Sequence, residues 1–213
     1  INTSFVVGSS VRKILEGKIP NLEVITKKTE VDLMLENEVL KTIKQRRMVF
    51  KFKGEPVEEE KLNTVLQAGY WSESFGDCEP WQFVVVDEPE LKRDLYELTK
   101  RLTIYTAGIK NAPVTVAIAI TGCGSSHFIE EGAIAAHNMA LAADSIGLGS
   151  YWLDIYDLEN KEDSVESEAK VLLGLPEDVR LTFLLPLGYP GHRREGKKVR
   201  FDEVVHYNRY GNE

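Results

Sequence analysis

The chain has 213 residues, 43% of them hydrophobic and 28% charged, a composition typical of a globular domain and unlike that of a membrane protein. Its formal net charge of −8 argues against general nucleic-acid binding, which needs a basic surface facing phosphates. The longest apolar run, Val114–Ile120, is far too short to span a bilayer, and no segment has the pattern of a secretory signal.

The cysteines and histidines show none of the spacings that mark a metal site or a redox motif. Cys78 and Cys123 form neither a CxxC pair nor a disulfide framework, so we expect a reduced, cytoplasmic protein. The four histidines lack metal-ligand spacing such as HExxH, so we expect no metal site. No GxGxxG motif follows a predicted strand, which argues against a Rossmann fold.

The first half of the chain predicts an N-terminal extension followed by alternating helices and strands. Residues 1–33 are polar and mixed in pattern, and we expect an arm or extension there and a single domain over residues 34–213. Apolar spacing predicts helices over 37–45 and 57–68, and the second has acidic residues in its first turn that complement the helix dipole. A strand over 83–86 and a helix over 90–100 are expected next.

The second half begins with the most apolar segment of the chain. Val114–Ile120 is apolar except for Thr115, which fits a central strand buried on both faces. The following pattern predicts a helix over 129–146, a strand over 151–156, a helix over 165–173 and a strand over 181–187. We expect the acidic segment 157–168 to be solvated and without chemistry, and the tail 201–210 to dock on a surface.

The helix over 129–146 carries a stripe of small residues spaced three and four apart. Such a stripe lets another helix approach closely. That neighbour can be part of the same chain, or it can belong to a second subunit. The stripe consists of Ala133, Ala136, Ala140, Ala143 and Gly147.

Four motifs follow one another along the chain. They are RRMVFKF at 46–52, WSESFGDCEPW at 71–81, GAIAAHNMALAADSIGLG at 132–149, and LGYP at 187–190 followed by KVR at 198–200. In this order they resemble the nitroreductase family of FMN enzymes, over about residues 36–211. Each motif alone is weak, but four in order are specific.

The resemblance implies a fold, a cofactor and an activity. The fold would be α+β, a three-layer arrangement in which helices flank a mixed, largely antiparallel sheet, and two chains would form an intertwined homodimer. FMN would lie at the subunit interface, with the small-residue stripe in the dimer core. Such enzymes transfer electrons from NAD(P)H through the flavin to a nitroaromatic, a quinone or a similar small acceptor.

The resemblance also assigns cofactor-binding residues. An FMN phosphate needs converging cations, which Arg46, Arg47, Lys198 and Arg200 would supply. The flavin ring would contact Met48, Phe50, Ser74, Asp77, Glu79, Asp154 and Ile155. No side chain is assigned as a catalytic acid or base, because the cofactor carries the hydride chemistry.

The ring-facing residues depart from the family pattern. Met48 stands where the family has a small hydroxyl residue, and Phe50 stands where it has Arg or Lys near the flavin N1/O2 edge. Losing that cation should disfavour the anionic reduced flavin and lower the reduction potential. Asp77 replaces the family's Asn and Glu79 its Gln, which makes the pocket more negative.

Three interpretations of these departures stay open. The protein binds FMN with altered tuning and a different substrate, for example a cationic one; or it holds a modified or different cofactor; or it binds a ligand without redox chemistry. The halotyrosine-deiodinating branch of the superfamily is not favoured, because no Tyr/Glu/Lys lid is found. Trp71 and Trp81 are interpreted as core or interface anchors and His137 as an interface histidine.

Overall fold

The computed structural model describes residues 36–122, 126–159, 161–193 and 195–211. The predicted N-terminal extension and Cys123 lie outside the described residues. The described residues from Glu38 onward belong to one compact unit. None of the described helices is long and apolar enough to cross a membrane.

The described strands form one sheet in which every named pair is antiparallel. An isolated parallel bridge joins Met48 to Ser150. The mixed, largely antiparallel sheet predicted from the sequence is confirmed. Its order is β1 (Trp81–Val86), β2 (Val114–Ile120), β5 (Arg180–Gly188) and β3 (Gly149–Ser150), with β4 (Leu153–Asp154) also paired to β5.

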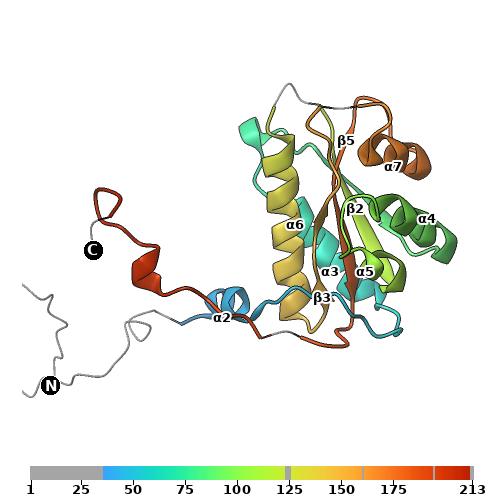
Figure 1. Cartoon of the computed structure of the whole chain (residues 1–213). Helices are drawn as coiled ribbons and strands as arrows, with labels where there is room; N and C mark the ends of the chain where they lie inside the picture. Colours follow the sequence, from blue (N-terminus) through green and yellow to red (C-terminus); the bar gives the residue numbers. More distant parts are fainter. Residues whose placement is uncertain (1–35, 123–125, 160, 194, 212–213) are drawn as a thin grey trace, which may run out of the picture. The chain divides into compact units, whose positions relative to one another are not determined.

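Helices cover both faces of the sheet and give the predicted three layers (Figure 1). On one face lie α3 (Glu59–Tyr70) and α6 (Phe128–Ser145), and α2 (Glu38–Gln45) contacts α6. On the other face lie α4 (Pro89–Thr99), α5 (Ala107–Asn111) and α7 (Val165–Leu173). Short 3₁₀ turns form at Phe75–Asp77 and Phe201–Glu203.

The central strand β2 supplies both hydrophobic cores. Every residue of β2 is buried, as predicted. Val116 and Ile118 pack with α3 and α6, whereas Ala117 and Ala119 pack with α4, α5 and α7. Because successive side chains of a strand point to opposite faces, a continuous apolar run builds two cores at once.

The small-residue stripe of α6 packs inside its own chain. Ala136, Ala140 and Ala143 are at most 1% exposed, and Ala136 and Ala143 share a core with Val65 of α3. Its assignment to a dimer core is therefore wrong for these three residues. The face of α6 that the single chain leaves exposed carries Ile134 and His137 instead.

Most predicted elements are found close to their predicted bounds, two local predictions are wrong, and one short helix was not predicted. The strand predicted over 151–156 is reduced to the two residues of β4, and the short helix α5 was not predicted. The segment 157–168 is not solvated throughout, because α7 begins at Val165 and Glu166 is 1% exposed.

Gly132 lies where α6 crosses β5, and a methyl group there has no room. An added Cβ would be 2.4 Å from Thr182 Oγ1 and 2.9 Å from Thr182 Cβ. The Thr182 hydroxyl is held in place because it donates to the carbonyl oxygen of Ile118 at 2.8 Å. Overpacking typically costs about 1–3 kcal/mol, which outweighs the preference of helices for alanine over glycine.

We therefore expect Gly132→Ala to lower the free energy of unfolding by roughly 1–2 kcal/mol. Urea denaturation followed by circular dichroism measures the change. Gly54→Ala is the matched control, because an added Cβ at Gly54 has no heavy atom within 4 Å. If both variants were as stable as the unaltered protein, the close contact between α6 and β5 would be wrong.

Candidate functional site

The segment that carries the first motif, residues 46–52, lies at one end of the sheet. Val49 N donates to the carbonyl oxygen of Ser150 at 3.0 Å, beside the bridge between Met48 and Ser150. Val49 itself is fully buried, whereas Met48 is 42% exposed. Because successive side chains of an extended segment point in opposite directions, Val49 anchors the segment in the core and Met48 points outward.

The second basic segment, residues 190–200, runs antiparallel along the first, residues 46–52. Phe52 forms a bridge with Pro190, and Gly191 N donates to the carbonyl oxygen of Lys51 at 2.8 Å. Farther along, an added Cβ at Gly196 would be 2.9 Å from Nε of Arg47. The structure thus brings the residues that precede Lys198 and Arg200 alongside Arg47. Gly196 and Arg47 are 149 positions apart in the sequence.

The predicted phosphate ligands have different surroundings. Arg47 donates to the carbonyl oxygens of Lys44 at 2.7 Å and Arg46 at 2.9 Å. Burial lowers the pKa of His137, and the nearby charge of Arg46 lowers it further. Arg46 therefore lies close to the exposed face of α6.

Lys198 and Arg200 are both exposed. Arg200 forms an ion pair with Asp202, and its Nε lies 3.9 Å from Glu203 Oε1. Hydrogen bonding to Arg200 lowers the pKa of Asp202, so this carboxylate stays charged and competes with any anion for the guanidinium.

Phe50 is part of a cluster of three aromatic rings. Its ring centroid lies 5.3 Å from that of Tyr105 and 4.7 Å from that of Tyr151. Tyr151 is 1% exposed, and Phe50 is half-buried beside it. An uncharged, packed cluster thus occupies the position where the family resemblance implies a cation.

The strand segment predicted to contact the flavin ring has one exposed and one buried residue. Asp154 is exposed. Ile155 is 2% exposed, and its N–H donates to the carbonyl oxygen of Thr182 at 3.0 Å. Ile155 therefore fixes the segment to β5, and Asp154 is the residue of the two that faces outward.

The loop of the second motif surrounds a hollow of about 440 Å³. Within the loop, Glu79 N donates to Ser74 Oγ at 3.0 Å. Helix α6 holds the loop through buried Glu131, whose Oε1 accepts from Phe75 N at 3.2 Å. Five residues line the hollow: Ser72, Glu73, Ser74, Asp77 and Glu79.

Two predicted site residues of this loop adopt left-handed backbone conformations. Asp77 has φ of 54° and Glu79 has φ of 47°. Aspartate tolerates this region, but for glutamate it is uncommon and carries strain. The hydrogen bonds to Ser74 and Glu131 hold the strained loop. Three acidic residues, Glu73, Asp77 and Glu79, therefore line one hollow.

The structure corrects the interpretation of one cysteine and separates the two tryptophans. Cys78 is disulfide-bonded, so the expectation of reduced cysteines is wrong for this residue. Trp81 is 6% exposed and is a core residue, as expected. Trp71 is 77% exposed and belongs to no core of the described chain, which leaves the interface alternative.

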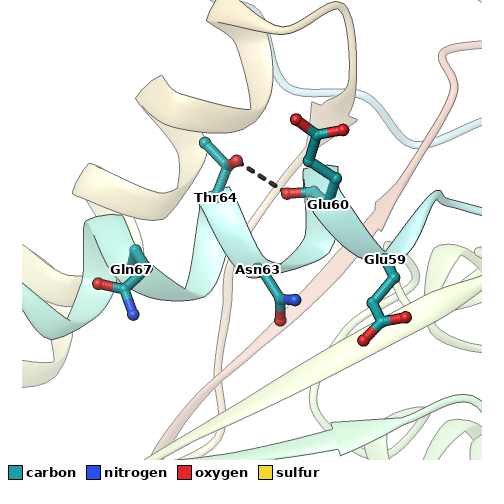
Figure 2. Close-up of a pocket in the computed structure, with 5 residues that line it drawn as sticks. All are labelled: Glu59, Glu60, Asn63, Thr64 and Gln67. Carbon is teal, nitrogen blue, oxygen red and sulfur yellow. Dashed lines mark hydrogen bonds between the residues drawn. The ribbon is translucent and has the colours of Figure 1, made fainter.

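A larger hollow of about 750 Å³ lies elsewhere, along the outer side of α3 (Figure 2). All of its lining residues come from this one helix, and Thr64 Oγ1 donates to the Glu60 carbonyl oxygen at 2.8 Å within it. None of them is a predicted site residue, so the hollow is a surface feature of α3. They are Glu59, Glu60, Asn63, Thr64 and Gln67.

The buried hydroxyl of Tyr151 makes no well-formed hydrogen bond in the described part of the chain, although the backbone of Gly108 lies close enough to offset part of the rise in its pKa. Its ring packs tightly, since an added Cβ at Gly108 would be 2.6 Å from Tyr151 Cε1. Burial raises the pKa of this phenol well above its ordinary value, so it stays neutral. A buried hydroxyl without a partner costs about 1–3 kcal/mol.

We therefore expect Tyr151→Phe to raise the free energy of unfolding by about 1 kcal/mol, because it removes the unpaired hydroxyl and keeps the ring. Urea denaturation measures the change. Tyr105→Phe is the control, since Tyr105 is 52% exposed and its hydroxyl can bind water. A loss of stability in Tyr151→Phe would mean that the hydroxyl has a partner.

Comparison with known proteins gives consistent matches. The Nitroreductase family model matches residues 43–107 and 100–189. A protein of Methanothermobacter thermautotrophicus assigned as NADH dehydrogenase/NAD(P)H nitroreductase is 32% identical over 180 residues, which are 81% of this chain and 88% of that protein.

Solved structures match over a similar length. A Bacteroides thetaiotaomicron structure with the same assignment has a TM-score of 0.74 and 27% identity, and the match covers 83% of this chain and all of that chain. The FMN-dependent nitroreductase of Clostridium difficile has a TM-score of 0.72 and 25% identity, over 80% of this chain and 99% of its own.

The three-layer α+β fold with an antiparallel sheet is that of solved nitroreductases. The chain belongs to the nitroreductase family. The matched residues include the Arg46 segment and the Ser74–Glu79 loop and end at Tyr189. Lys198 and Arg200 lie beyond them, so their assignment depends on the packing of the C-terminal segment along Arg47.

Proposed function

We propose that this protein binds FMN at the interface of a homodimer and oxidises NAD(P)H, passing the electrons to a small acceptor such as a nitroaromatic or a quinone. The observation that carries the proposal is the pairing of two basic segments, because Gly196 lies against Arg47. We further propose that residues 34–213 form the cofactor-binding domain and residues 1–33 an extension.

The phosphate end of the site fits FMN. Arg46 and Arg47 come from one segment, and Lys198 and Arg200 follow Gly196 on the other. Guanidinium groups bind phosphate oxygens through pairs of N–H donors, and the family's phosphate ligands are of this type. Arg200 must release Asp202 before it can bind the phosphate.

The residues predicted to contact the flavin ring can accept FMN, but they give the ring different electrostatic surroundings from those in the family pattern. When bound, FMN supplies the hydride-accepting ring, and the protein supplies its orientation and electrostatic surroundings. Phe50 and Met48 offer an apolar surface but no cation to the N1/O2 edge. Asp77 and Glu79 add negative charge near the ring. A low reduction potential and a preference for cationic acceptors follow from these residues.

The homodimer is supported by the distribution of site residues along α6. The loop with Ser74 is fixed near the start of α6, through Glu131. The basic segments lie near its other end, where Arg193 pairs with Asp144. Two α6 helices packed antiparallel would place the loop of one subunit beside the basic segments of the other, and exposed Trp71 and Ile134 would be covered.

A second candidate function is ligand binding without redox turnover. The packing of Phe50 on Tyr105 and Tyr151 favours it, because these rings occupy space near the predicted flavin edge. The three carboxylates of the Glu73–Glu79 loop also disfavour a reduced, anionic flavin. The basic phosphate segments favour the redox function instead.

The visible spectrum of the purified protein tests the proposal. We expect a flavin band after addition of FMN, bleached by NADH or NADPH in the absence of oxygen. A flavin band that neither nucleotide bleaches would support the ligand-binding alternative. Failure to retain any FMN at excess concentration would overturn the FMN-dependent function and would leave only the binding of a different ligand. Size-exclusion chromatography would test the dimer separately.

A further inference from the structure

The C-terminal basic segment is fixed by one residue that no family motif includes. Arg193 forms an ion pair with Asp144 through Nη1, and its Nη2 donates to the carbonyl oxygen of Leu148 at 3.0 Å. The Asp144 side chain is 8% exposed and that of Arg193 36%. A planar guanidinium that binds a carboxylate and a carbonyl oxygen at the same time has a defined orientation.

Asp144 lies in the last turn of α6, where a carboxylate is unfavourable. The C-terminal end of a helix carries partial negative charge, so an acidic side chain there is repelled unless a cation compensates it. Arg193 compensates both the carboxylate and the free carbonyl of Leu148 just beyond the helix. The pair therefore joins the end of α6 to the C-terminal segment.

Arg193 precedes the contact between the two basic segments by three positions. Gly196 lies against Nε of Arg47, and Lys197, Lys198 and Arg200 follow. On the other side of Arg193, Gly191 is hydrogen-bonded to Lys51. The Arg193–Asp144 pair is thus one fixed point between Gly191 and the cations predicted to bind phosphate.

We propose that Arg193 is a positioning residue for the phosphate end of the cofactor site. By binding Asp144 and the Leu148 carbonyl, it holds the C-terminal cations beside Arg46 and Arg47 without contacting the phosphate itself. The inference rests on the proposed FMN binding, and it assigns to α6 a role in building the phosphate site.

Asp144→Asn separates positioning from simple electrostatics. This variant removes a negative charge near the site, so a purely electrostatic effect would tighten FMN binding. Loss of the ion pair would instead release Arg193 and the cations that follow it, and would weaken binding. Arg193→Lys keeps the charge but loses the two-pronged contact, so it should also weaken binding.

The binding experiment compares FMN with riboflavin, which lacks the phosphate. We expect Asp144→Asn and Arg193→Ala each to weaken FMN binding about tenfold, the usual effect of losing a charged hydrogen bond, while riboflavin binding stays unchanged. The double variant should be no weaker than the single ones, because both remove the same contact. Flavin fluorescence quenching measures the affinity of the unaltered protein and of each variant for both flavins.

Trypsin cleavage after Lys197 and Lys198 in the flavin-free protein gives a second readout, which we expect to accelerate in both single variants. Unchanged cleavage, or tighter FMN binding by Asp144→Asn, would overturn the positioning role. Equal losses for FMN and riboflavin would overturn its link to the phosphate. If the unaltered protein bound neither flavin, the proposed function would fail, and the cleavage rates would still decide whether Arg193 holds the segment.

Discussion

Replacing Glu166 with alanine is expected to lower the free energy of unfolding by about 3–5 kcal/mol, the cost of leaving a buried ion-pair partner uncompensated. Glu166 is 1% exposed, and each of its carboxylate oxygens accepts two hydrogen bonds. Arg180 donates to both oxygens, at 2.7 and 2.8 Å. The remaining donors are the N–H groups of Asp157, at 2.6 Å, and Leu181, at 3.1 Å.

The large effect follows from what stays behind. Alanine would leave the Arg180 guanidinium, whose side chain is 21% exposed, without its carboxylate, and two backbone N–H groups without acceptors. Hydrogen bonding to Glu166 raises the pKa of Arg180, so the arginine stays charged in this environment. The segment after β4 would also lose its attachment to α7, which is the hydrogen bond from the Asp157 N–H to Glu166.

Glu168→Ala, on the same turn of α7, is the matched control. Glu168 pairs with Arg101 at 2.6 Å, but both side chains are at least 40% exposed. Exposed pairs contribute only about 0–1 kcal/mol, so this variant should unfold at nearly the same urea concentration as the unaltered protein. Similar losses in the two variants would contradict the distinction between the buried and the exposed pair.

Phe50→Arg is expected to raise the reduction potential of bound FMN by about 30–65 mV, which corresponds to about 1.5–3 kcal/mol from one charged hydrogen bond in a two-electron couple. The physical reason is that a cation at this position would stabilise the negative charge that reduction adds at the N1/O2 edge. Anaerobic titration against a reference dye measures the potential.

Phe50→Leu provides the control for this substitution. It removes the contacts with Tyr105 and Tyr151 as the arginine does, but it adds no charge. Any shift that both variants share reflects repacking of the aromatic cluster. The proposed position of Phe50 at the ring edge would be wrong if arginine and leucine shifted the potential equally.

The sequence was sufficient where the pattern depended on local periodicity. The nearly continuous apolar run of β2 predicted burial on both faces, and α7 begins and ends where its apolar spacing indicated. That Arg46 and the C-terminal cations belong to one site stays a prediction from the motifs. The structure supplies the pairing of Gly191 with Lys51 that brings their segments together.

The sequence was insufficient where a residue's role depends on a distant partner. Glu166 in the first turn of α7 has the same pattern as a solvated, dipole-complementing glutamate, and its burial depends on Arg180 in another element. The alanine stripe of α6 permits close packing on whichever side a helix lies, and α3 occupies it. Asp144 did carry a signal, because an acidic residue in a last helical turn requires a cation.

Arg46 lies close enough to the exposed face of α6 to influence the titration of His137. Arg46 would hold the anion, and a second subunit would cover His137. Both would therefore lie on the same side of α6. Thermodynamic linkage makes the two events reciprocal, so the free energy that FMN adds to subunit association is returned as tighter FMN binding. In the proposed homodimer, retention of the flavin would then depend on protein concentration, and dilution alone would release it.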